Sequence, residues 1–123
     1  MKKRILIQSA AIKDNRLQFK ANETIKGLKS GEQILVDSDQ FSFIYLMEDE
    51  EDFTYIVLPE KTWPFLNSAR EQKLAVWVTF NDEMTELTGF LEDLDYVLSN
   101  IKDNSNYGEE MVAKIDNFFM DIL

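Results

Sequence analysis

The chain has 123 residues, of which 45% are hydrophobic and 12% aromatic, and its formal net charge is −10. These values predict one folded domain, residues 1–123, and exclude a disordered chain, because the apolar content is sufficient for a packed core. No apolar run approaches the roughly 18–20 residues of a transmembrane helix. The acidic excess argues against binding to nucleic acid or to an anionic membrane, because their phosphates repel a negative surface.

The sequence contains no cysteine and no histidine. Disulfides, Cys/His zinc sites and the Ser-His-Asp or Cys-His catalytic arrangements are therefore excluded. Any acid–base chemistry would depend on Asp, Glu, Tyr or Lys side chains with shifted pKa values. We leave open whether the protein is an enzyme but favour a non-catalytic one, and we predict no cofactor, no metal site and no catalytic residue.

The first elements in the chain predict a β-hairpin. Basic residues followed by apolar ones resemble the start of a signal peptide, but the apolar run stops at Gln8, short of the roughly 7–15 residues that a secretory segment needs. We therefore predict a cytoplasmic protein with a strand over Arg4–Ala11. A turn at Lys13–Asn15 connects it to a second strand over Arg16–Ala21, because Asp and Asn tolerate turn geometry.

The middle of the chain organises the rest of the fold. After a loop over residues 22–32, strands are predicted at Gln33–Asp37, Gln40–Glu48 and Phe53–Leu58. The last two strands have apolar residues at odd and even positions, which is typical of central strands covered on both faces. The five consecutive acids of Glu48–Asp52 predict a solvated hairpin loop, because a calcium loop needs spaced ligands and a glycine.

The second half of the chain is mostly helical. Thr62 is predicted as the N-cap of a helix that ends near Gln72, with Trp63 in the core. Later strands and helices are predicted at Lys73–Phe80, Met84–Leu87, Thr88–Lys102 (with Thr88 as N-cap) and Glu109–Ile122. The fold class is therefore α+β, with helices packed against a mainly antiparallel sheet of about six or seven strands, in the order β-β-β-β-β-α-β-β-α-α.

Three blocks of sequence carry a resemblance to a known family. They are LVDSDQFSFIYL (Leu35–Leu46), LPEKTWP (Leu58–Pro64) and NIKDNSNYGEEM (Asn100–Met111). In order and spacing they resemble the YjbL-like proteins, a small uncharacterised family of Bacillus- and Staphylococcus-type bacteria, across nearly the whole chain. One departure is Asp103, where the family pattern has glycine. The resemblance implies a cytoplasmic bacterial protein and assigns no activity, cofactor or catalytic residue.

Two polar clusters are candidate binding sites. Asp37 and Asp39 flank a serine after a buried strand, so they could bind Mg²⁺ through carboxylate oxygens or share a raised pKa. Alternatively, they accept backbone hydrogen bonds and cap a turn. Asn100, Asn104, Asn106, Tyr107 and Gly108 form a second cluster between the last two helices. Its amide side chains could bind a small polar ligand or a peptide backbone, with Tyr107 stacking on it. The alternative for these residues is capping of the helix ends.

The central strands raise a question of coverage. If all three helices lie on one face, apolar side chains remain on the other, either Ile44, Leu46, Ile56 and Leu58 or their aromatic neighbours. Because such a patch seldom stays open to water, we predict that the N-terminal hairpin or a homodimer covers it.

Two functions follow from these patterns. The first is a non-catalytic, acidic, cytoplasmic module that binds or regulates a protein partner or associates with itself. The alternative is a small metal-dependent hydrolase, or a protein that binds a small polar ligand, using Asp37, Asp39 and Tyr107. Stabilisation by millimolar Mg²⁺ or Mn²⁺ would support the alternative.

Overall fold

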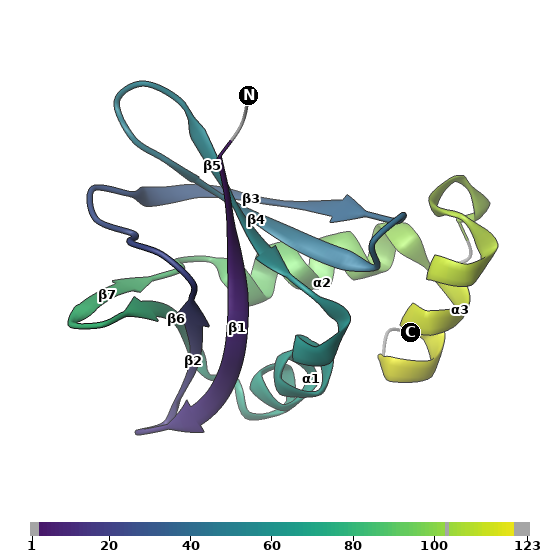
Figure 1. Ribbon diagram of the computed structural model, residues 1–123. Coiled ribbons are helices and arrows are strands. Elements are labelled where there is room, and N and C mark those ends of the chain that lie inside the picture. The colour runs from purple at the N-terminus through teal and green to yellow at the C-terminus, as the bar shows by residue number, and fades with distance from the viewer. Residues whose placement is uncertain (1–2, 103, 120–123) are drawn as a thin grey trace.

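The computed structural model describes residues 3–102 and 104–119 (Figure 1). Its strands are β1 (Lys3–Lys13), β2 (Arg16–Ala21), β3 (Lys29–Asp37), β4 (Ser42–Glu48), β5 (Phe53–Leu58), β6 (Ala75–Phe80) and β7 (Glu83–Glu86). Its helices are α1 (Trp63–Gln72), α2 (Phe90–Ile101) and α3 (Glu109–Phe118), with short 3-10 turns η1 (Glu60–Thr62) and η2 (Ser105–Tyr107). The α+β class and the predicted order of strands and helices are confirmed.

All seven strands form one sheet in the order β3-β4-β5-β1-β2-β6-β7. Of its six pairings, four are antiparallel, while β1–β5 and β2–β6 are parallel. The prediction of a mainly antiparallel sheet is therefore correct for most pairs, but the sheet is mixed. Figure 1 shows that the sheet curls, so that β6 and β7 lie apart from the layer of β3, β4 and β5.

The N-terminal hairpin lies in the centre of the sheet. Asp14 and Asn15 have φ values of 55° and 62°, which are the angles of a type I′ turn, and Lys13 pairs with Arg16. β1 pairs with β5 and β2 pairs with β6, so the hairpin is hydrogen-bonded on both sides. The prediction that this hairpin covers one face of the sheet is therefore wrong.

The helices pack on the concave face of the sheet (Figure 1), around a cluster of aromatic side chains. Trp63 at the start of α1 is fully buried, as predicted, and its ring centroid lies 5.5 Å from that of Phe43 and 5.8 Å from that of Phe119. Close to them, Tyr45 and Phe90 pack with their centroids 5.6 Å apart. Offset and tilted aromatic pairs of this kind add to the stability gained by burial.

Neither of the two predicted N-cap residues acts as expected. α2 begins at Phe90, after Gly89 with φ 70°, so glycine rather than Thr88 occupies the N-cap position. Thr62 occupies the N-cap position of α1 as predicted, but its hydroxyl oxygen accepts no hydrogen bond from the helix. The hydroxyl instead donates to the carbonyl of Pro59 at 2.6 Å. Thr62 therefore has the predicted position without the capping hydrogen bond, whereas Thr88 lies one residue before the N-cap position of α2.

β4 is buried on both faces, as predicted, with Phe43 fully buried in the core and Ile44 only 5% exposed on the opposite face. The register pairs Ile44 with Val57 and Tyr45 with Ile56. Ile56 therefore lies in the core, and the prediction that it would share the outer face with Ile44 is wrong. The outer face of the sheet is built from Ile44, Leu46, Tyr55 and Val57 instead.

Candidate functional site

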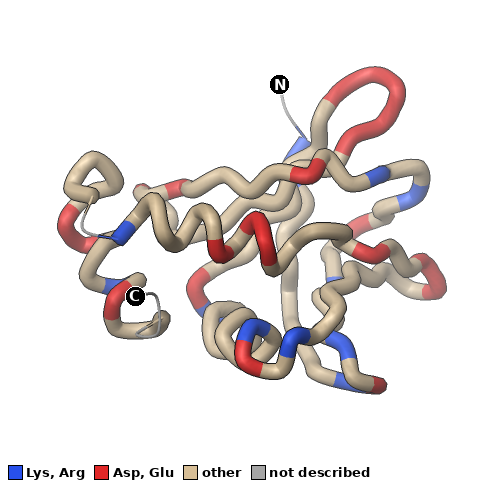
Figure 2. Tube along the Cα trace, turned by 180° about the vertical axis from the view of Figure 1, so that it is seen from behind, with Lys and Arg blue, Asp and Glu red and all other residues tan. Residues whose placement is uncertain are grey.

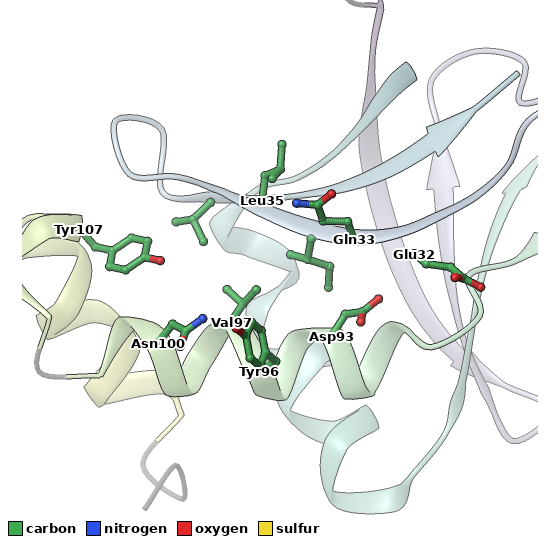
Figure 3. A pocket seen from close by; sticks show the side chains of 10 residues that line it. Glu32, Gln33, Leu35, Asp93, Tyr96, Val97, Asn100 and Tyr107 are labelled. Atoms are coloured by element: carbon green, nitrogen blue, oxygen red, sulfur yellow. The ribbon is translucent and has the colours of Figure 1, made fainter. Parts of the chain in front are cut away.

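A groove with a volume of about 360 Å³ runs between β3 and α2 (Figure 3). It is lined by Glu32–Val36 of β3, by Asp93, Tyr96, Val97 and Asn100 of α2, and by Tyr107 of η2. Figure 3 shows Glu32 and Asp93 at one end of the groove and Asn100 and Tyr107 at the other. The groove therefore has an acidic end and an uncharged polar end.

The groove follows the open edge of the sheet. β3 is the first strand in the sheet order, so one of its edges pairs with no other described strand. Successive side chains of a strand point to opposite faces, yet five consecutive residues of β3, Glu32–Val36, line this groove. The groove must therefore border the strand edge itself. Backbone N–H and C=O groups at such an edge are available to another strand.

A β-bulge shapes the acidic end of the groove. The register of β3 against β4 shifts between Ser30 and Ile34, and Glu32 adopts a φ of 54°. A Cβ atom on Gly31 would lie 2.9 Å from the carbonyl oxygen of Leu46, so the close approach of the two strands requires glycine there. Bulges bend a strand and redirect its side chains, which is how Glu32 comes to line the groove.

The hydroxyl of Tyr45 holds this bulge against the start of α2. It donates to the carbonyl of Thr88 at 3.0 Å and also hydrogen-bonds the hydroxyl of Ser30. Because the only hydroxyl hydrogen of Tyr45 goes to Thr88, Ser30 donates to Tyr45, and Ser30 Oγ accepts from the backbone N–H of Glu32 at 3.0 Å. Burial is the main cause of the raised pKa of Tyr45, so its hydroxyl stays protonated.

Glu32 and Asp93 lie at the acidic end of the groove without a counter-ion from the described part of the chain. Burial raises the pKa of Asp93 above its ordinary value, and the charges of Glu32 and Glu92 raise it further. Asp93 Oδ2 is buried and accepts no hydrogen bond from the part of the chain that the structure describes. α2 carries acidic residues and has no Lys or Arg between Phe90 and Ile101 (Figure 2).

Asp37 and Asp39 do not line the groove. Asp37 Oδ1 accepts from the backbone N–H of Gln40 at 3.1 Å, and Asp37 Oδ2 lies 3.6 Å from Nη2 of Arg4. Asp39 is exposed in the turn that follows β3. Within residues 3–102 and 104–119, no three Asp or Glu side chains gather as a metal site would require. The hydrolase alternative remains a prediction from the sequence.

Of the cluster predicted between the last two helices, Asn100 and Tyr107 line the groove. Asn104 caps η2: its Oδ1 accepts from the backbone N–H of Asn106 at 3.1 Å, and its Nδ2 donates to the carbonyl of Asn100 at 3.2 Å. Asn106 is exposed, and Asp103 lies outside the described residues. The structure thus does not bring the five predicted site residues together.

Sequence reasoning missed the residues that form most of the groove. The sequence could have pointed to Tyr96, because it is an aromatic residue that lies off the apolar stripe of α2. In the structure its side chain is 70% exposed. The sequence could not have pointed to Glu32 and Asp93, since their proximity depends on how β3 packs against α2. No helix in the described part of the chain is long and apolar enough to cross a membrane.

Comparison with known proteins places the chain in a family. A family model described as "Family of unknown function (UPF0738)" matches residues 5–119. The chain belongs to the UPF0738 family. The resemblance to the YjbL-like proteins is therefore confirmed. The stretch that matches the UPF0738 model includes the whole groove, from the bulge in β3 to Tyr107.

UPF0738 relatives match over their full length. The UPF0738 protein YjbL of Bacillus subtilis is 42% identical over 124 residues, covering 98% of this chain and 100% of the relative. A UPF0738 protein of Bacillus velezensis is 41% identical over 122 residues with the same coverage, and one of Bacillus cereus is 36% identical over 123 residues, again with that coverage. No solved structure matches the chain.

Proposed function

We propose that this UPF0738 protein is a non-catalytic, cytoplasmic module that binds an extended segment of a protein partner. The segment adds to the sheet as a further strand at the open edge of β3 and lies in the groove above α2. The supporting observation is that five consecutive residues of an edge strand, Glu32–Val36, line one groove. Strand addition of this kind uses backbone hydrogen bonds for affinity and side-chain pockets for specificity.

The dimensions of the groove suit a short segment. Five residues of an extended strand span roughly 17 Å, at about 3.3–3.4 Å per residue. Alternate side chains of an added strand would point toward α2, where Tyr96 and Val97 offer an apolar contact and Asn100 offers an amide. A side chain near the far end would meet the ring of Tyr107, which keeps its proposed role in stacking.

A selection followed by hydrogen exchange tests this function. Random peptides displayed on phage are selected against the folded protein, and the enriched sequences are synthesised. We expect these peptides to slow amide exchange at the edge-facing positions of Glu32–Val36, because a new strand would engage those N–H groups. Protection confined to β7, the other edge strand of the sheet, or no enrichment at all would contradict the proposal.

A pair of variants separates the groove from the rest of the surface. Tyr96→Ala removes the exposed ring beside the groove and should weaken binding of the selected peptides about tenfold. Met84→Ala removes an exposed apolar side chain from β7, away from the groove, and should leave binding unchanged. Equal losses in the two variants would show that the peptides bind without regard to the groove.

A further inference from the structure

We infer that the segment bound in this groove carries a lysine or arginine at the end that meets Glu32 and Asp93, followed by uncharged residues along β3. This inference deepens the proposed function and rests on it. It names the chemistry of the partner, which the open strand edge alone does not provide. Three features support it: the charges at one end, the unsatisfied oxygen there, and the uncharged character of the remaining lining.

The first feature is charge. Glu32 comes from the bulge in β3 and Asp93 comes from the first turns of α2, so two separate elements place carboxylates at one end of the groove. No Lys or Arg of the described chain forms an ion pair with either of them. A lysine or arginine of the partner segment would supply the missing positive charge, and charge-assisted hydrogen bonds are the stronger kind.

The second feature is the buried oxygen. Asp93 Oδ2 is inaccessible to solvent and receives no hydrogen bond from any described residue, although nearly all buried polar atoms in proteins have a partner. Burial disfavours the charged form of Asp93 and raises its pKa, and the charge of Glu32 raises it further. A cationic donor would favour the ionised carboxylates, so binding would relieve a cost that the free protein carries.

The third feature is the remaining lining. Beyond Glu32 and Asp93, the groove offers only amide, aromatic and aliphatic side chains, such as Gln33, Asn100 and Tyr107. One basic position at one end, with uncharged neighbours, therefore matches the groove better than a uniformly basic segment. An acidic segment would be repelled by both the groove and the net charge of −10.

A peptide series tests the inference on the intact protein. An enriched phage peptide is synthesised with lysine, glutamine or glutamate at the position nearest Glu32 and Asp93, as located by hydrogen exchange. Fluorescence anisotropy then gives the dissociation constant of each version. We expect the lysine version to bind about tenfold more tightly than the glutamine version, and the glutamate version to bind more weakly still.

Matched variants identify the groups responsible. Asp93→Asn and Glu32→Gln should each reduce the lysine preference to about twofold or less while leaving the affinity for the glutamine peptide nearly unchanged. Glu92→Gln removes the same charge from the neighbouring position of α2, which does not line the groove, and should retain most of the preference.

The outcomes separate the inference from the proposed function. Peptides that protect Glu32–Val36 but bind equally with lysine, glutamine and glutamate would overturn the basic-residue inference and leave strand addition intact. A preference that disappears equally in Glu92→Gln would also overturn it, because the effect would then be general electrostatics. Failure of any peptide to protect β3 would remove both proposals.

Discussion

Arg4 of β1 and Asp37 of β3 form an ion pair across the outer face of the sheet, although β4 and β5 lie between their strands. Arg4 Nη2 lies 3.6 Å from Asp37 Oδ2, and Arg4 Cζ lies 5.8 Å from the ring centroid of Tyr55. A contact between these strands must pass over the side chains of the intervening strands. It therefore helps to explain how Ile44 and Val57 are only 5% and 9% exposed on a face that carries no described helix.

Removal of this cover is expected to expose apolar surface. Arg4→Ala should cost less than about 1 kcal/mol of stability, because the ion pair is partly exposed and screened. It should nevertheless increase binding of the dye ANS, since the outer face loses the long side chain that lies over Tyr55. Lys13→Ala, at the exposed end of β1, is the control and should leave ANS fluorescence unchanged. Equal fluorescence in the two variants would contradict the prediction.

The homodimer remains a prediction for the same face. Leu6 and Phe53 are 45% and 40% exposed there, which is the kind of apolar surface that a second copy would bury. Light scattering of the wild-type protein at micromolar concentration should then give twice the mass of the chain, and Leu6→Lys should restore the mass of one chain. A wild-type mass equal to one chain would show that no dimer forms.

Asp93→Asn is expected to stabilise the free protein at neutral pH. The pKa of Asp93 is raised in the folded state, first by burial and then by Glu32 and Glu92. Its stabilising contribution is therefore complete below the unfolded pKa and is lost as the pH rises through the folded pKa. Asparagine cannot ionise, so the free energy of unfolding of the variant should exceed that of the wild type at pH 7.

Urea denaturation at several pH values measures the effect of Asp93→Asn, and the difference between variant and wild type should diminish toward acidic pH. Tyr45, whose pKa Asp93 also raises, is protonated throughout that range and does not confuse the result. Glu92→Gln, which removes only the smallest of the three causes of the raised Asp93 pKa, is the comparison on the same helix and should stabilise the protein less. A variant that is less stable than the wild type at pH 7 would show that the Asp93 carboxylate is satisfied after all.

Glu83 is expected to make the opposite contribution. Its carboxylate accepts hydrogen bonds from the backbone N–H of Ile25 and from the hydroxyl of Thr24, both at 2.8 Å, and these bonds lower its pKa. The resulting stability is present above the unfolded pKa and is lost as the pH falls through the folded pKa. Glu83→Ala should therefore be destabilised at pH 7, and the difference from the wild type should become smaller at acidic pH.

Hydrogen exchange provides a local measurement of the Glu83 contact. Faster exchange at the amide of Ile25 in Glu83→Ala would show that the carboxylate holds the loop between β2 and β3. Glu86→Ala, on the same strand and exposed, is the control. Unchanged exchange at Ile25 in the Glu83 variant would contradict the prediction.

Gly31→Ala is expected to disturb the bulge in β3. The added Cβ would lie 2.9 Å from the carbonyl oxygen of Leu46, which is backbone and cannot rotate away. A loss of about 1–3 kcal/mol is expected, comparable to other cases of overpacking. Denaturation measures the loss, and peptide binding at Glu32–Val36 should weaken with it. Lys29→Ala, at the exposed start of the same strand, is the control and should leave both stability and peptide binding nearly unchanged.

The sequence predicted the order of strands and helices because hydrophobic periodicity and turn residues act locally. The turn at Asp14 and Asn15 and the burial of Trp63 were readable for this reason. The parallel β1–β5 and β2–β6 pairs were not, because each joins segments that are distant in the sequence. The register of β4 against β5 was not predicted either: Val57, and not Ile56, lies beside Ile44. A shift of one residue exchanges the two faces of a strand.

The candidate site was less predictable than the fold. Tyr107 was found because an aromatic residue stood out in a polar loop, and it does line the groove. Asp37 and Asp39 were predicted as a binding site because they are paired carboxylates. In the structure Asp37 contacts Arg4 and accepts a hydrogen bond from the backbone of the turn. Glu32 and Asp93 are two acids among many in an acidic chain. Their importance depends on the packing of β3 on α2 and on the bulge at Gly31, which only the three-dimensional structure reveals.

The central position of the β1–β2 hairpin has a consequence for folding kinetics. The β1 side of the hairpin cannot pair until β5 has been synthesised as far as Leu58, and the β2 side cannot pair until β6 has been synthesised as far as Phe80. Pairings between such distant segments slow the search for the native state. Until they form, two unprotected strand edges are open to wrong partners. During synthesis, the segment most exposed to misassembly is thus the one that ends up best enclosed.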